Sequence, residues 1–329
     1  MGTRFTIGVN SIEKLKKIKS KNIANIYCGY VDTFSRKKWL EAFCVINKRG
    51  EKTSICGRKQ FKAFALEAER KNINIFVTFN GTYTPEQYSW IIKAINFVSS
   101  FKSVKGIIVT DIGLLLRLKK INYKKEIIIS TIGTVFNSSS VSFFKQFGIK
   151  RIVLDRQLKT EEILSILNAH RDMDFEIFVT FANCLFVDGF CSFTHTTELQ
   201  RKNKKKFYNV YGNLMMCGLI YLLQMSKRYK VINNDNNKYS INFDRSFKYF
   251  ATGCNMCKIN ELKEFADRVV YKIITRDTRG IFKNKFQIIN FYLDELSNMK
   301  NDIDKENLFN KIFNYPCNKT GCYANKKIL

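Results

Sequence analysis

One stretch of sequence decides the predicted fold: residues 106–131, which read GIIVTDIGLLLRLKKINYKKEIIIST. A short apolar run at Gly106–Thr110 is followed by an amphipathic segment at Ile112–Lys119 and a second apolar run at Glu126–Thr131. Two short apolar runs joined by a helical pattern are typical of a βαβ unit, whose strands are parallel. The stretch therefore predicts a parallel sheet covered by helices.

The same alternation recurs along the chain. The predicted strands are Arg4–Val9, Ile23–Cys28, Ile73–Phe79, Gly106–Thr110, Glu126–Thr131, Arg151–Leu154, Phe175–Thr180 and Val269–Ile274. Helical patterns between them cover Ile12–Ile18, Lys59–Lys71, Pro85–Phe97, Ile112–Lys119, Ser138–Phe147 and Thr160–His170, with Thr160 as the expected cap of the last. This alternation predicts an α/β fold, a (β/α)8 TIM-like barrel, with an open doubly wound sheet as the alternative.

The regular spacing breaks after the seventh predicted strand. We interpret residues 192–256 as an insertion over the barrel mouth, since long loops of this kind are usually functional. The barrel domain then covers residues 1–280, and residues 281–329 form a C-terminal extension with a helix at Phe286–Met299 and a cysteine-containing tail.

Composition limits the class of protein. The chain has 329 residues, 45% of them hydrophobic, and a formal charge of +28, so it can bury a core and is not a disordered basic tail. The charge suits a nucleic-acid partner, but it also fits a general bias toward Lys, Ile, Asn and Phe. No apolar run is long enough for a membrane span, and no signal-peptide core opens the chain, so we expect a cytoplasmic protein.

The densest chemistry lies in five cysteines. Cys184 and Cys191 follow the seventh predicted strand, and Cys217 and the CxxC pair Cys254 and Cys257 come later. Thiolates gathered from loops suit zinc or an iron-sulfur cluster. Because only one pair is CxxC, we favour a 4Fe-4S cluster, with zinc as the alternative. Burial of the thiols as small apolar side chains is the third interpretation.

The other five cysteines carry weaker signals. Cys28 lies in an apolar strand and is expected in the core. Cys44 and Cys56 flank a predicted hairpin, where one of them could add a ligand. Cys317 and Cys322 could form a second small site in the tail.

Catalytic candidates lie near the carboxyl ends of the strands, where barrel enzymes carry their chemistry. Arg156 and Arg276 could bind a carboxylate or phosphate through paired hydrogen bonds, or could form ion pairs at the rim. Glu176 could orient a ligand loop or simply be a satisfied strand residue. A hydrolase has little support, because HExxH is absent and Cys191 with His195 is the only conceivable dyad.

The segment from Glu176 to Ser192 resembles the signature of the collagenase-like peptidase family U32. The matching residues are Glu176, Phe178, Ala182, Cys184, Gly189, Cys191 and Ser192, while Phe181 replaces a glycine of the pattern. Weaker likenesses follow in order over nearly the whole chain. Two carboxylates of the family pattern are missing, since Ile274 and Gln157 stand in their places.

The resemblance implies a barrel-like fold and, in similar proteins, a 4Fe-4S cluster on four cysteines. Such proteins take part in hydroxylation without molecular oxygen, of the ubiquinone ring or of RNA bases, with prephenate implicated as oxygen donor. Cys184 and Cys191 carry over as ligands, and Cys217, Cys254 and Cys257 compete for the other two places.

We therefore predict a U32-like iron-sulfur protein that takes part in modification of an RNA base or a small aromatic substrate. Two alternatives stay open: a collagenase-like peptidase, and a non-catalytic iron-sulfur or RNA-binding partner subunit. The latter would use Lys202–Lys206 with Phe207, Tyr208 and Tyr211 as a basic, stacking surface.

Overall fold

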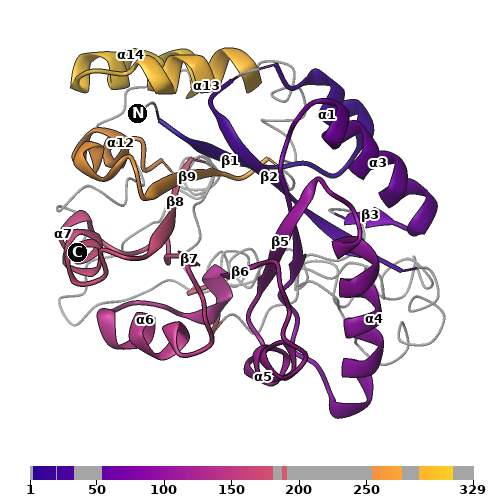
Figure 1. Cartoon of the computed structure of the whole chain (residues 1–329). Coiled ribbons are helices and arrows are strands. Elements are labelled where there is room, and N and C mark those ends of the chain that lie inside the picture. The colour runs from indigo at the N-terminus through magenta and orange to yellow at the C-terminus, as the bar shows by residue number, and fades with distance from the viewer. Residues whose placement is uncertain are drawn as a thin grey trace, which may run out of the picture.

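The computed structural model describes residues 3–19, 21–32, 54–180, 187–190, 254–275 and 289–313. Eight parallel strands form a closed barrel surrounded by helices (Figure 1). The barrel closes because β1 pairs with both β2 and β9. The barrel strands are β1 (Phe5–Gly8), β2 (Ile23–Val31), β4 (Ile75–Phe79), β5 (Val104–Val109), β6 (Glu126–Ile129), β7 (Arg151–Val153), β8 (Asp174–Thr180) and β9 (Val269–Ile273). The predicted (β/α)8 barrel is confirmed, and the open-sheet alternative is wrong.

A helix follows each barrel strand along the chain. These helices are α1 (Ile12–Lys17), α3 (Arg58–Arg70), α4 (Tyr88–Ser99), α5 (Ile112–Lys120), α6 (Ser138–Lys145), α7 (Thr160–Ala169), α12 (Cys257–Glu261) and α13 (Ile289–Asn298). Short 3-10 turns occupy Pro85–Gln87, Thr131–Gly133 and Lys263–Phe265. Within the described part of the chain, no helix is long and apolar enough to cross a lipid bilayer.

Several details differ from the sequence prediction, among them the helix α12, which was not expected. A short strand, β3 (Ser54–Cys56), pairs in parallel with the end of β2 and was not expected. The cap of α7 is Lys159, because its backbone N–H donates to Glu162 Oε2 at 2.7 Å, so Thr160 is the first helical residue. A second helix, α14 (Asp302–Phe313), follows α13 in the C-terminal extension.

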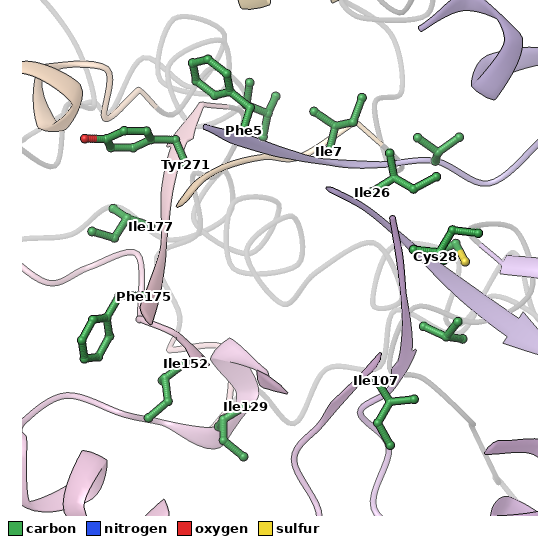
Figure 2. Close-up of a cluster of buried hydrophobic side chains, with 14 of the residues drawn as sticks. Phe5, Ile7, Ile26, Cys28, Ile107, Ile129, Ile152, Phe175, Ile177 and Tyr271 are labelled. Atoms are coloured by element: carbon green, nitrogen blue, oxygen red, sulfur yellow. The ribbon is translucent and has the colours of Figure 1, made fainter. Parts of the chain in front are cut away.

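The outward faces of the strands and the inner faces of the helices form the main core. Figure 2 shows side chains such as Phe5, Ile107 and Phe175 pointing away from the barrel axis. Cys28 lies among them, fully buried, which confirms its predicted core position. Because parallel strands in a barrel are covered on both faces, they appear in the sequence as nearly continuous apolar runs.

The inward faces form a second, smaller apolar cluster. This interior layer consists of Tyr27, Phe76, Ile108, Ile128, Val153, Phe178 and Ile274. Gly106 leaves room for it, since a Cβ at that position would lie 2.9 Å from the Phe76 ring and only 2.0 Å from the backbone oxygen of Glu126. The barrel interior is therefore packed, and the interior layer separates its amino-terminal end from the mouth.

Candidate functional site at the barrel mouth

Paired charges occupy the barrel interior on the amino-terminal side of the interior layer. Lys272 Nζ lies 2.6 Å from Glu176 Oε2, and both side chains are buried. The same Nζ lies 4.0 Å from the centroid of the Tyr27 ring. Arg151 extends the group, since it lies 3.7 Å from Glu176 and 3.2 Å from Glu126. Each buried charge thus has an opposite charge beside it, as burial in a medium of low dielectric requires.

Glu176 lies away from the mouth. Phe178 is two residues further along the same face of β8, so its ring stands between Glu176 and the carboxyl end of the barrel. Ile274, which replaces a glutamate of the family pattern, belongs to the same apolar layer. The geometry shows Glu176 as the partner of Lys272 and Arg151, and its proposed role in orienting a ligand loop stays a prediction.

Arg156 is the central residue of the mouth. It is buried, its guanidinium carbon lies 4.7 Å from the Phe178 ring centroid, and it forms an ion pair with Asp188. Asp188 stands in the sequence between Cys184 and Cys191. Arg156, which the sequence suggested as a binding residue for a substrate carboxylate, therefore forms an ion pair with a carboxylate of the protein itself.

Two further contacts fix the turn at residues 187–190. The carboxyl of Asp155 accepts hydrogen bonds from the backbone N–H of Gln157, at 2.9 Å, and from the backbone of Asp188. Gly189 packs so closely on the loop after β6 that a Cβ would lie 2.1 Å from Thr134 Cγ2. A glycine is required there because no side chain fits.

The segment from Cys254 to Cys257 meets the same arginine. The backbone N–H of Asn255 donates to the oxygen of Val179 at 2.7 Å, which extends the end of β8. Asn255 Nδ2 lies 3.4 Å from the backbone oxygen of Arg156. Cys254 is buried, and its Sγ accepts from the backbone N–H of Met256 at 3.5 Å. Arg156 thus contacts one cysteine-bearing segment through its side chain and the other through its backbone.

Several predicted site residues lie outside the described residues: Cys44, Cys184, Cys191, Cys217, Arg276, Cys317, Cys322 and the basic run Lys202–Lys206. Their assignments stay predictions. Of the five proposed ligands, the structure describes Cys254 and Cys257. Among the residues it describes, no three His, Cys, Asp or Glu side chains gather into a metal-binding group.

Sequence reasoning missed Asp155 and Asp188 as residues of the mouth. Burial, and secondarily the charge of Asp188, raise the pKa of Asp155. The sequence contains one signal for each of these residues. Asp155 directly follows the sixth predicted strand, and Asp188 stands between two proposed cysteine ligands. Their contact with each other and with Arg156 depends on how the chain returns to the mouth.

Comparison with known sequences identifies the family of the chain. The sequence model of peptidase family U32 matches residues 10–276. The match includes the barrel strands from β2 to β9, and β1 lies outside it. The chain belongs to peptidase family U32. Its barrel mouth, with Arg156 and the two cysteine-bearing segments around it, is thus the mouth of a U32 barrel.

Two similar proteins carry the name tRNA hydroxylation protein P. The chain is 35% identical to the protein of Escherichia coli K12 over 86 residues, which are 26% of this chain and 19% of that protein. It is 33% identical to the protein of Haemophilus influenzae, with the same two shares. The matched segment thus spans about a fifth of these relatives.

Solved structures give more distant likenesses. The U32 peptidase Mk0906 has a TM-score of 0.48 and 12% identity, and the match covers 85% of this chain and 95% of that one. A glycerophosphodiester phosphodiesterase from Parabacteroides distasonis has a TM-score of 0.34 and 10% identity, and the match covers 54% of this chain and 84% of that one. The barrel of this U32 protein is established by its own strand pairings.

The raised pKa of Asp155 predicts a pH effect. A carboxyl whose pKa is higher in the folded state favours folding at low pH, and this contribution is lost as the pH rises through the folded pKa. Asp155→Asn keeps an oxygen for the Gln157 N–H and removes the buried charge. We expect the stability of the variant, relative to the parent, to increase between about pH 3 and pH 7, measured by urea unfolding.

Asp172→Asn is the matched control. Asp172 is exposed, and its hydrogen bond with Lys145 lowers its pKa, so the relative stability of this variant should fall over the same range of pH. If the relative stability of both variants changed with pH in the same direction, the raised pKa of Asp155 would be contradicted.

The Arg156–Asp188 pair predicts coupled protection of the two cysteine-bearing segments. Asp188→Asn removes the carboxylate that pairs with the buried Arg156 guanidinium, and breaking a typical buried pair costs about 3–5 kcal/mol. We expect faster amide hydrogen exchange at residues 187–190 and at Asn255, with little change in α3. Exchange that rises at 187–190 alone would show that Arg156 does not couple the segments.

Proposed function

We propose that this U32 protein takes part in oxygen-independent hydroxylation of an RNA base, with tRNA as the substrate class, and that it carries a 4Fe-4S cluster at the barrel mouth. Family membership and the names of the two bacterial relatives support the RNA part of the proposal. A formal charge of +28 suits a polyphosphate substrate.

One observation carries the proposal: Arg156 connects the segments that hold four of the five clustered cysteines. Its side chain pairs with Asp188, between Cys184 and Cys191, and its backbone oxygen accepts from Asn255, between Cys254 and Cys257. Sequence distance alone would allow these segments to be far apart. Their common contact supports a shared site for their thiols.

The donor set fits a cluster. Four thiolates from loops are the usual ligands of a 4Fe-4S centre, and N–H donors to sulfur tune its potential. The Met256 N–H already points at Cys254 Sγ, and Cys254 is buried. We assign Cys184, Cys191, Cys257 and either Cys217 or Cys254 as ligands, with zinc as the alternative metal. When bound, a cluster would supply electron transfer.

The remaining mouth residues would position and protect the site. The Arg156–Asp188 ion pair holds the first cysteine-bearing segment on the barrel, and the interior layer beneath it excludes water. Asp155 keeps Oδ2 buried without a hydrogen-bond partner among the described residues. Burial is the main cause that raises the pKa of this carboxyl.

One observation favours a second candidate, a partner subunit that holds a cluster without the complete active site. Ile274 places an apolar side chain in the barrel interior where the family pattern has a glutamate. A missing carboxylate removes a group that could transfer protons. Measurement of tRNA modification distinguishes the two candidates.

Anaerobic purification tests the cluster. The protein should be brown and contain about four irons and four sulfides per chain. Cys184→Ala and Cys191→Ala should each lose the chromophore, whereas Cys28→Ala should keep it because Cys28 is a core side chain. A colourless parent protein with stoichiometric zinc would overturn the cluster assignment.

Modification of tRNA tests the reaction. The gene is expressed in Escherichia coli that lacks its tRNA hydroxylation protein P, and tRNA nucleosides are analysed by mass spectrometry. We expect a nucleoside heavier by one oxygen atom, absent with the Cys191→Ala variant. A cluster-containing protein that restores no modified nucleoside would favour the partner-subunit candidate.

A further inference from the structure

Phe190 is the most exposed large apolar side chain among the described residues. Its side chain is 76% exposed, compared with 40% for Phe143 and 42% for Phe291. An isolated exposed phenylalanine on a helix surface needs no explanation. Phe190 differs because it lies at the barrel mouth, directly before Cys191 in the sequence.

The backbone that carries Phe190 is held firmly. The preceding residues are fixed by the Arg156–Asp188 ion pair and by the close contact of Gly189 with Thr134. The N–H of Phe190 also donates to the backbone oxygen of Val187, at 3.1 Å. An exposed ring on a fixed turn loses little conformational entropy when it binds a flat partner.

We propose that Phe190 is a stacking platform for an unpaired base of the RNA substrate. This inference rests on the proposed function and deepens it, because it names a binding residue for the substrate. Enzymes that modify a base inside RNA must expose it, and exposed bases commonly stack on aromatic side chains. Phenylalanine offers no hydrogen bond, so it contributes stacking and apolar contact and leaves base identity to neighbouring polar groups.

Position and charge favour RNA over an apolar protein partner. Phe190 lies at the carboxyl end of the barrel, which is where barrel enzymes bind substrates. The chain carries 56 basic and 28 acidic residues, an excess that attracts a polyanion to its surface. Phe190 directly precedes Cys191, a proposed cluster ligand, in the sequence.

Binding of RNA by ring variants tests the inference. The probes are bulk tRNA and a short single-stranded oligoribonucleotide, with the matching duplex for comparison. Phe190→Ala and Phe190→Leu should both bind the single strand on the order of 10-fold more weakly, because both lose the aromatic face. Phe190→Trp should retain binding, and its added fluorescence should be quenched when the single strand binds.

Phe143→Ala and Phe143→Trp are the matched controls, since Phe143 is an exposed phenylalanine on α6. They should bind RNA as the parent does, and the tryptophan should report no quenching. Iron and sulfide content should be equal in all Phe190 variants, which separates loss of substrate contact from loss of the cluster.

Other outcomes overturn the inference in distinguishable ways. If Phe190→Leu binds as tightly as the parent, the ring provides general apolar contact and stacking is wrong. If all variants bind RNA equally, Phe190 is no part of the binding site, and the proposed RNA substrate is unaffected. If the parent protein binds neither RNA probe, the proposed function fails together with the inference.

Discussion

Closure of the barrel is the constraint on which the rest of the structure depends. Once β1 pairs with both β2 and β9, every second side chain of each strand points into an enclosed space. A charge in that space needs a partner within it, because water cannot solvate it. Lys272 and Glu176 meet this requirement across the β8–β9 pairing, and Arg151 links Glu176 with Glu126. Removing one member of such a group costs more than the pair itself contributes.

The paired charges and the interior layer together divide the barrel. Charges fill the amino-terminal part, apolar rings and aliphatic chains fill the middle, and Arg156 begins the mouth by stacking on Phe178. The interior layer thereby separates the mouth from the charged interior. Among the described residues, Glu176 pairs with Lys272 and Arg151 beneath this layer, and its proposed role in orienting a ligand loop stays a prediction.

Arg156 pairs with a carboxylate of the protein itself, and its proposed role in binding a substrate carboxylate or phosphate stays a prediction. A buried guanidinium at a strand end suits a substrate carboxylate or phosphate, but here the carboxylate comes from the protein's own turn. Asp188 stands between two cysteines in the sequence, and Asn255 stands between two others. Arg156 therefore contacts both cysteine-bearing segments. Membership of peptidase family U32 supports the proposal that these cysteines share one cluster site.

The sequence by itself determined the eight barrel strands, most of the helices around them and the barrel, because apolar periodicity reports local structure and repeated βα units leave few topologies. It also determined that five cysteines lie in the sequence between β8 and β9, the last two strands of the barrel. It could not determine that Asp188 and Asn255 both contact Arg156, nor that Asp155 lies beside Asp188. Only the tertiary structure decided these points, because they depend on contacts between residues about 30 to 100 positions apart, whose geometry is set by barrel closure and leaves no periodic trace in the sequence.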